Sequence, residues 1–502
     1  MAPQPPTAGL DRRTLQIGGV VAIGLIMSVI DTTIVNVALE HLAADLHEPL
    51  STIQWVSTGY LLSLAVVIPL SGWATERFGS KRVWLAAIAG FGVGSLLCGL
   101  STTAGELIAF RVLQGFGGGM LVPVGFTLAT QAAGPERAGA VLSLIGVPIL
   151  LGPIFGPILG GFILDTAGWH WIFFVNIPIA VVAFGLAVRM LDGAAGRQDA
   201  GRLDWIGVLL ACPGLVGLVF GLSETETRGG LGHPLALVPI VTGVALLVAF
   251  VWHAHRAARP LIDLRLFRGE AFAAGAATTF LLGLALFGAL LLLPLYFQLD
   301  RGESALHAAL LMAPQGVGAA IALPISGRIT DRIGGGPVVV VGATVATLAT
   351  LPWAFVAGDT PYALLMAILF VRGIGLGSSM QPALAASLKV LRTDQVPRAT
   401  AALNTIRQVG ASIGTAVAAV LLESQAQATM PQARGGSGVL EPLPPAVRAE
   451  IAAPLADAFG HVFLWATVAT GLAIAGGLVL WRAETRTRRE LNPGPSMGAL
   501  HG

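Results

Sequence analysis

One carboxylate stands alone within the first long apolar stretch of the chain. Residues 15–39 carry no charged side chain except Asp31. As a helix, this stretch is long enough to cross about 30 Å of hydrocarbon. A carboxylate near the middle of such a helix is costly unless it faces protein or water, and it is a functional group by default. We therefore expect Asp31 to carry a proton, to bind a cation, or to do both; the alternative is a buried structural ion pair.

Three arginines also interrupt apolar stretches: Arg111, Arg372 and Arg407. Arg111 is the strongest candidate partner for Asp31. A guanidinium does not release its proton in proteins, so Arg111 would act by keeping a neighbouring carboxylate ionised, or by binding water or an anion. The alternative is an arginine that packs between helices and donates to backbone carbonyls.

The composition is that of a membrane protein. Of the 502 residues, 55% are hydrophobic and only 11% are charged, whereas soluble proteins carry about 25% charged residues. Too few polar side chains are present to coat a water-soluble particle, so we expect an all-α polytopic membrane protein. Cys98 and Cys212 each lie in an apolar run, which is typical of small core residues rather than of a disulfide or metal pair.

Fourteen apolar segments follow a polar tail, and their positive charges are distributed unevenly. With the N-terminus in the cytoplasm, 22 of the 29 Lys and Arg residues fall on the cytoplasmic side, four outside and three within spans. This bias predicts that both termini are cytoplasmic. The segments lie at about 15–39, 52–74, 83–101, 104–128, 138–164, 170–191, 205–223, 234–252, 271–299, 305–327, 336–357, 361–388, 398–423 and 459–481.

The chain contains an internal repeat. Residues 72–79 and 327–334, 255 positions apart, share the pattern Gly-x-x-Thr-acid-Arg-apolar-Gly. A second echo pairs Phe110-Arg111 with Val371-Arg372. Two parallel six-helix halves are typical of secondary transporters, whose substrate site lies near the midplane. The predicted organisation is a cytoplasmic tail (1–14), an N-terminal half (15–191), two inserted helices (192–270), a C-terminal half (271–481) with an extracellular loop (424–458) that includes a short helix at 446–457, and a disordered cytoplasmic tail (482–502).

Several short stretches of the chain are motifs with a recognisable pattern: residues 30–39 (IDTTIVNVAL), 72–82, the sequence Arg111-x-x-Gln114-Gly115, and residues 146–161, 169–178 and 404–410. Through these motifs, residues 14–482 resemble the major facilitator superfamily and, within it, the fourteen-helix drug:proton antiporters. Glu40, Glu76, Ser80 and His170 depart from the usual residues of that family.

The resemblance implies the major facilitator fold and proton-coupled export of amphipathic or cationic small molecules across the cytoplasmic membrane. It also implies a monomer in the lipid bilayer that is driven by the proton gradient, uses no cofactor and binds no nucleic acid. Asp31 and Arg111 would couple protons to transport. The candidate lining of the substrate cavity is Asp31, Gln54, Tyr60, Arg111, Gln114, Phe280, Phe287, Gln315, Gln381, Asn404 and Arg407.

A second group of residues is expected to control conformation. An acid such as Glu76 that faces a partner across the halves would latch one state, and a stripe of glycines and prolines would let one helix bend at the interface between the halves. The alternatives are charges that only set topology and ordinary close packing. The candidates are Gly72, Glu76, Arg77, Gly79, Arg82, Gly152, Pro153, Gly156, Pro157, Gly160, Gly327, Asp331, Arg332 and Gly334.

Other chemistry finds little support. Gly115–Gly119 lies inside an apolar span without the Lys-Ser/Thr ending of a phosphate loop, which argues against nucleotide binding. The pair His253 and His255 is a weak metal signal, so no metal site is expected. No catalytic signature is present, which disfavours an enzyme. The alternatives for function are a dedicated exporter of one natural product, siderophore or lipid, and a proton-coupled anion symporter that binds its substrate through Arg111, Arg372 and Arg407.

Overall fold

The computed structural model describes residues 11–192, 201–227, 232–429 and 445–491, and within these ranges the chain forms helices and no β-strand. The helices are α1 (Arg12–Asp45), α2 (Leu50–Phe78), α3 (Ser80–Leu100), α4 (Ala104–Ala133), α5 (Ala138–Ala167), α6 (His170–Phe174), α7 (Asn176–Met190), α8 (Trp205–Thr227), α9 (Pro234–Arg256), η2 (Leu264–Arg268), α10 (Glu270–Leu295), η3 (Tyr296–Asp300), α11 (Ala305–Ile333), α12 (Gly335–Thr350), η4 (Leu351–Phe355), α13 (Tyr362–Gly377), α14 (Met380–Lys389), α15 (Val396–Thr429) and α16 (Pro445–Leu491).

The described helices agree with fourteen membrane spans. Thirteen of them are long and apolar enough to cross a bilayer, counting α6 with α7 and α13 with α14 as single spans. The fourteenth is α5, whose parts Ala138–Gly152 and Phe155–Ala167 are bent by 48° relative to each other. Such a bend is expected where prolines remove backbone hydrogen bonds from a helix.

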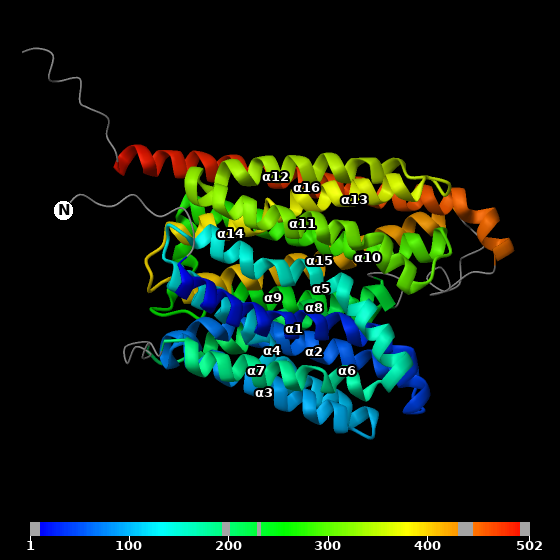
Figure 1. Cartoon of the computed structure of the whole chain (residues 1–502), viewed down its shortest axis with the longest axis horizontal. Coiled ribbons are helices and arrows are strands. Elements are labelled where there is room, and N and C mark those ends of the chain that lie inside the picture. The colour runs from blue at the N-terminus through cyan, green and yellow to red at the C-terminus, as the bar shows by residue number, and fades with distance from the viewer. Residues whose placement is uncertain (1–10, 193–200, 228–231, 430–444, 492–502) are drawn as a thin grey trace, which may run out of the picture.

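The helices form two halves with the inserted pair between them (Figure 1). Helices α1–α7 make the N-terminal half, and helices α10–α16 make the C-terminal half. Helix α8 packs against α2 of one half and α15 of the other, while α9 packs against α8. The halves meet mainly where α5 packs on α11 and where α2 packs on α15.

Both described chain ends lie at the same end of the bundle (Figure 1). We call this the terminal end and the opposite one the distal end. An even number of spans requires this arrangement. The charge bias places the terminal end in the cytoplasm, and that orientation remains a prediction.

Two predicted helix boundaries differ from the structure. The segment 424–458 was expected to be a loop with a short helix at 446–457; α15 continues to Thr429, and α16 begins at Pro445 and runs without a break into the last span. Residues 430–444 fall outside the described residues. The C-terminal tail was expected to be disordered from 482, but α16 continues to Leu491. Both segments are rich in residues with high helix propensity, and apolar character alone misses such helical extensions.

Both copies of the repeated motif end in a glycine turn. Gly79 ends α2 with φ +87°, and Gly334 ends α11 with φ +104°. This left-handed backbone is readily accessible to glycine alone among the common residues. Each turn delivers the chain directly into the next span.

Candidate functional site

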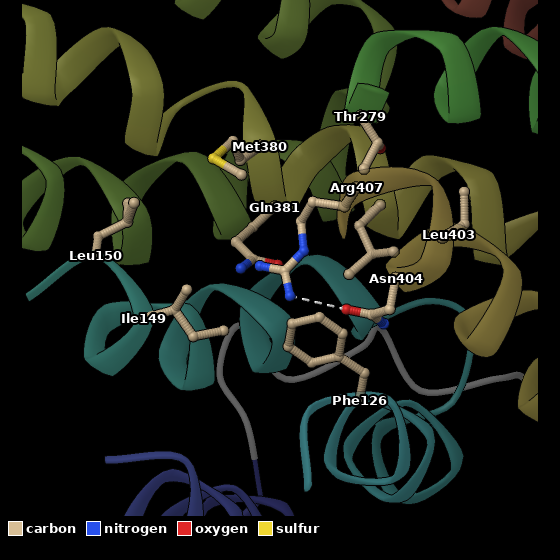
Figure 2. A pocket seen from close by; sticks show the side chains of 10 residues that line it. Phe126, Ile149, Leu150, Thr279, Met380, Gln381, Leu403, Asn404 and Arg407 are labelled. Carbon is tan, nitrogen blue, oxygen red and sulfur yellow. Dashed lines mark hydrogen bonds between the residues drawn. The ribbon is translucent and has the colours of Figure 1, made fainter. Parts of the chain in front are cut away.

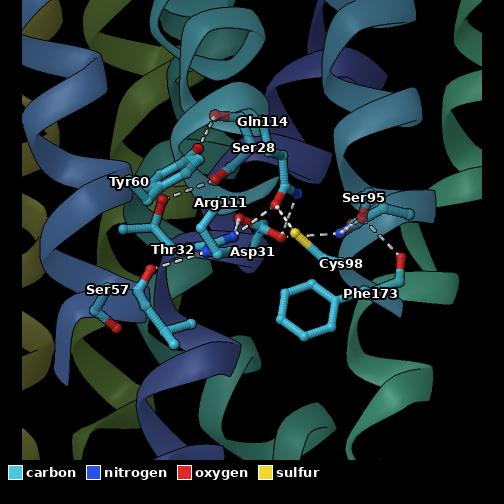
Figure 3. A network of polar contacts seen from close by, with 12 residues as sticks. Ser28, Asp31, Thr32, Ser57, Tyr60, Ser95, Cys98, Arg111, Gln114 and Phe173 are labelled. Carbon is cyan, nitrogen blue, oxygen red and sulfur yellow. Dashed lines mark hydrogen bonds and ion pairs between the residues drawn. The ribbon is translucent and has the colours of Figure 1, made fainter. Parts of the chain in front are cut away.

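A buried ion pair lies inside the N-terminal half. Arg111 Nη1 on α4 donates to Asp31 Oδ2 on α1 at 2.6 Å, and the two side chains are 1% and 0% exposed (Figure 3). Gln114 Nε2 and Asn176 Nδ2 both donate to Asp31 Oδ1, at 2.9 Å and 3.0 Å. Three donors on one carboxylate compensate its negative charge where no bulk water can do so.

The remaining contacts of Arg111 hold it in place. Its Nε donates to the carbonyl of Val56 at 3.1 Å, and its Nη1 also donates to Gln114 Oε1 at 2.8 Å. The guanidinium carbon lies 4.1 Å from the centre of the Tyr60 ring, within cation–π range. Gln114 follows Arg111 by three residues, which places both side chains on one face of α4. Arg111 and Gln114 therefore bind Asp31 from one face of α4.

Three members of this network were missed by the sequence analysis. Asn176 binds both Asp31 and Ser95 Oγ, the latter at 3.1 Å, and Cys98 Sγ contacts Gln114 Oε1 at 3.6 Å. Asn176 lay in a stretch that matched the family pattern, but no role was assigned to it. The only sequence evidence for a role of Asn176 is an uncharged amide in an apolar span, and this is weaker evidence than a charged side chain in the same place.

The C-terminal half also buries an arginine, with different partners. Arg372 on α13 is 2% exposed. Its Nη1 donates to Gln315 Oε1 on α11 at 2.6 Å, and its Nε donates to Thr350 Oγ1 on α12 at 3.1 Å. Among the described residues no carboxylate pairs with Arg372.

Two adjoining cavities lie where the halves meet. Ile149 and Leu150 from α5, together with Arg407 from α15, line both of them. Figure 2 shows the first cavity, in which Arg407 Nη2 donates to Asn404 Oδ1 at 3.1 Å. The other residues of the first cavity are Phe126, Thr279, Met380, Gln381, Leu384, Leu403 and Asn404. Those of the second are Leu286, Phe287, Leu290, Gln315, Ala319, Gly373 and Leu376.

Five of the eleven predicted lining residues are found there: Phe287, Gln315, Gln381, Asn404 and Arg407. The structure places Asp31, Tyr60, Arg111 and Gln114 in the buried network of the N-terminal half, and it places Gln54 and Phe280 in neither cavity. A polar residue in a span shows that the residue is buried against protein, but not which helix face meets the cavity.

The repeated motif joins the two halves at the terminal end. Glu76 of α2 pairs with Arg398 Nε of α15 at 2.8 Å. In the second copy, Asp331 of α11 accepts hydrogen bonds from the backbone N–H groups of Gly139 and Ala140, at 2.8 Å and 2.9 Å. These two groups open α5, where a carboxylate also meets the positive end of the helix dipole.

The motif glycines allow this approach. A Cβ atom on Gly72 would lie 3.0 Å from Arg398 Cα, and one on Gly327 would lie 2.6 Å from the carbonyl of Gly139. The motif arginines Arg77, Arg82 and Arg332 are exposed at the same end. The predicted role of the motif in gating thus has a geometric basis in its acids and glycines.

The glycine stripe of α5 packs within its own half, while α5 itself lies between the halves and packs on α11. Added Cβ atoms on Gly152, Gly156 and Gly160 would lie 2.1 Å, 1.9 Å and 2.9 Å from side chains of Val29, Thr33 and Ile34. All three neighbours belong to α1 of the same half, so the stripe does not face the other half. Pro157 is partly buried, and the side chain of Pro153 lies outside the described residues. A small-residue stripe indicates close approach without naming the partner helix.

Comparisons with known proteins agree with this architecture. The family model described as Major Facilitator Superfamily matches residues 21–415. A protein named multidrug resistance protein B homolog from Mycobacterium tuberculosis is 41% identical over 421 residues, covering 83% of this chain and 77% of that one. A putative multidrug resistance protein MdtD from Serratia proteamaculans is 35% identical over 406 residues, covering 81% and 84%.

Solved structures of low sequence identity share the fold. The proton:xylose symporter XylE aligns with a TM-score of 0.59 at 13% identity, covering 94% of this chain and 98% of that one. The human organic anion transporter MFSD10 aligns with a TM-score of 0.59 at 14% identity, covering 93% and 100%. With its fourteen spans, its repeated motif and these relatives, the chain belongs to the multidrug-efflux transporters of the major facilitator superfamily.

Proposed function

We propose that this chain is a proton-coupled antiporter that exports amphipathic small molecules across the cytoplasmic membrane. The observation that carries the proposal is the buried pair of Asp31 and Arg111, an ionisable group inside the membrane-spanning part of one half. The relatives named as multidrug resistance proteins support export as the direction. The proton gradient supplies the energy without a cofactor, and the working unit is a monomer.

Proton uptake at Asp31 is linked to the release of Arg111. A proton on the carboxylate removes the negative charge that Arg111 compensates, and the guanidinium then takes up other partners. The proton enters from the outer side and leaves to the cytoplasm after the halves have rocked. The latch at the terminal end, made by Glu76 with Arg398 and by Asp331 with the start of α5, closes the cytoplasmic side in one state and opens in the other.

The substrate binds in the cavities between the halves rather than at Asp31. The sequence suggested that Asp31 itself contacts a cationic substrate, but its carboxylate is fully buried and holds three donors. A dedicated exporter of one natural product, siderophore or lipid would use the same machinery. A proton-coupled anion symporter would differ in the direction of net transport.

The test is proton-driven accumulation of a fluorescent substrate in inverted vesicles, normalised to the amount of protein. We expect Asp31→Asn to fold, because asparagine still accepts from Arg111, but to lose accumulation because it cannot carry the proton. Asp31→Glu should keep part of the activity. Glu136→Gln, at an exposed position, is the control. Accumulation by Asp31→Asn at the wild-type rate would exclude Asp31 as the coupling group.

The orientation has its own test. Asp359 is exposed in the loop between η4 and α13 at the distal end. We expect a cysteine at this position to react with an impermeant thiol reagent applied to intact cells, because the charge bias places the distal end outside. The native Cys98 and Cys212 are buried and give a low background. Labelling that requires permeabilised cells would reverse the orientation.

A further inference from the structure

We infer that the two adjoining cavities between the halves bind an anionic group of the substrate. Arg407 makes the direct contact, and Arg372 supplies a second positive charge behind Gln315. The inference rests on the proposed export function and names its substrate class, amphipathic organic anions. It differs from the expectation of cationic substrates that Asp31 suggested.

Arg407 is the charged group of the first cavity. It is half-buried, and among the described residues it donates a hydrogen bond only to the neutral amide oxygen of Asn404. Among the described residues that line either cavity, none is an aspartate or a glutamate. A guanidinium has five N–H donors, so Arg407 keeps donors available toward the cavity. Figure 2 shows its guanidinium lying among Gln381, Ile149 and Phe126.

Asn404 fixes the direction of this guanidinium. Its Nδ2 donates to the carbonyl of Thr400 at 2.8 Å, so its oxygen is the end that faces Arg407. Both polar ends of Asn404 are therefore occupied within α15. Asn404 thus serves to position Arg407 and has no carboxylate to compensate its charge.

Gln315 extends the positive region into the second cavity. Its Oε1 accepts from Arg372 Nη1 at 2.6 Å. Because a guanidinium donates hydrogen bonds and accepts none, the amide oxygen must face Arg372 and the NH₂ group must face away from it. The polar end of Gln315 left for a ligand in this cavity is therefore a donor, which suits an anion.

The first cavity contributes a further polar group that lacks a partner. Gln381 is 6% exposed, and its Oε1 is buried without a hydrogen-bond partner among the described residues. The two ends of an amide exchange places when the group turns by 180°. After such a turn, Gln381 presents its NH₂ group to an anion beside Arg407.

The partners of the three arginines that lie within spans indicate the charge of the ligand. Arg111 is neutralised by Asp31, whereas Arg372 and Arg407 each meet only neutral oxygens. A buried charge without a counter-charge is costly, and an incoming anion removes that cost. A cation in the same place would be repelled by both arginines.

The walls of the first cavity are apolar and define the rest of the ligand. Phe126, Ile149, Leu150, Met380 and Leu403 surround the polar groups. Such a lining, with few polar groups placed among apolar side chains, is typical of small-molecule sites. The substrate class is therefore a molecule with one anionic group, such as a sulfonate or carboxylate, on an apolar body.

The experiment compares three probes that share one apolar body: 1-naphthalenesulfonate, the naphthyl trimethylammonium cation and neutral 1-naphthamide. The two ions are permanently charged, so a pH gradient alone does not redistribute them. Proton-driven accumulation is measured in inverted vesicles, and binding is measured on the purified full-length protein by the thermal shift each probe causes. We expect the wild type to prefer the sulfonate over the cation by about tenfold or more in kcat/KM, as one strong charge contact would give.

The variants isolate the two arginines. Arg407→Gln should lose the preference for the sulfonate, mainly through KM, and should still accumulate the neutral probe. Arg407→Lys should keep part of the preference because the charge survives. Arg372→Gln should reduce the preference less, since this arginine acts through Gln315. Arg392→Gln, at an exposed ion pair of the terminal end, is the matched control and should behave as the wild type.

Two results would overturn the inference: a wild type that handles the cation as well as the sulfonate, or an Arg407→Gln variant that keeps the wild-type preference. If no probe is accumulated by the wild type, the proposed export function fails. In that case a sulfonate-specific thermal shift that Arg407→Gln abolishes still supports the anion site, and its absence refutes the site. If Arg407→Gln does not fold, the same comparison is made with Arg407→Lys and Arg372→Gln.

Discussion

The two halves hold their central arginines in opposite ways. In the N-terminal half Arg111 pairs with the carboxylate of Asp31 at 2.6 Å, while in the C-terminal half Arg372 is bonded to the neutral side chains of Gln315 and Thr350. The sequence echo around Arg111 and Arg372 shows that the positions are related. The repeat has thus kept a buried guanidinium but changed its partner. Because of this difference we propose a proton for the ion pair of the N-terminal half and an organic anion for the cavity beside Arg407 and Arg372.

At the terminal end the halves remain alike. Glu76 and Asp331 come from the two copies of the motif, and each reaches across to a helix of the opposite half. The two copies of the motif therefore make equivalent contacts between the halves at the terminal end, whereas the buried central arginines of the two halves have different partners.

The largest expected effect is on the free energy of unfolding, and it compares the charged partner of Arg111 with the neutral partner of Arg372. Asp31→Ala leaves Arg111 buried without a counter-charge and should cost about 3–5 kcal/mol of unfolding free energy. Gln315→Ala removes a neutral partner of Arg372 and should cost about 1–3 kcal/mol. Both are measured by thermal or denaturant unfolding in detergent. Equal losses would mean that the two arginines are not held differently.

The next largest effect tests whether the two copies of the repeated motif act alike at the terminal end. Gly72→Val and Gly327→Val introduce a Cβ atom into contacts of 3.0 Å and 2.6 Å with backbone of the opposite half. Each should weaken closure of this end by about 1–3 kcal/mol, the usual cost of overpacking. We expect slower transport with little loss of protein yield, because the strain is relieved when the halves separate.

Gly161→Val is the control for this pair, since nothing lies within 4 Å of an added Cβ there. Transport rates and yields of the three variants are compared in parallel. If only one motif variant slows transport, the two copies of the motif do not act alike.

A third prediction concerns a carboxylate of the C-terminal half that lacks the kind of partner Asp31 has. Asp300, at the end of the π-helix η3, is 5% exposed, and neither of its carboxylate oxygens has a hydrogen-bond partner among the described residues. The adjacent Arg301 donates instead to the carbonyl of Thr360 and to the hydroxyl of Tyr296. Asp300→Asn removes an unpaired buried charge and should raise stability by about 1 kcal/mol.

Asp359→Asn, at an exposed site of the same end, should leave stability unchanged and serves as the control. Unfolding temperatures of both variants give the answer. A clear loss of stability in Asp300→Asn would show that Asp300 is compensated after all, as Asp31 is.

The smallest effect is a pH dependence at the distal end. The pKa of Glu303 lies below its usual value of 4.5 because the hydroxyl of Tyr362 and the ring of His307 hydrogen-bond to its carboxylate, the Tyr362 bond contributing most. A lowered folded pKa means that this stabilisation is fully present above the usual pKa and is lost as the pH falls through the folded value. Glu303→Gln should therefore flatten the stability profile below about pH 4.5 and leave proton coupling at neutral pH intact.

Several elements of this molecule could be read from the sequence because a charge or a glycine in an apolar span has few explanations. The pairing of Asp31 with Arg111 belongs to this group, and so do Gly79 and Gly334, which the repeat singled out and which the structure shows in left-handed backbone. The membrane class follows from composition in a similar way, because a chain with so few charged residues cannot cover a water-exposed surface and must be embedded in lipid. These inferences depend on local chemistry and not on how the helices are arranged.

The remainder required knowledge of helix rotation and partner. The glycine stripe of α5 indicated close packing, but only the structure shows that α1 fills it. The polar residues of spans looked alike, although Gln114 turns into the N-terminal half and Gln315 toward a cavity. Asn176 was overlooked because an uncharged amide is tolerated in many packed spans. Which face of a helix meets which neighbour is set by tertiary packing, which a single sequence does not report.

Helix α15 has a mechanical consequence of its own. It carries Arg398, which latches the terminal end, and Arg407, which faces the cavity. Nine residues at the rise of an α-helix separate the two positions by about 14 Å along one axis. Both contacts therefore sit on one continuous helix. A tilt of α15 would displace Arg398 and Arg407 together, without intermediate side chains between them.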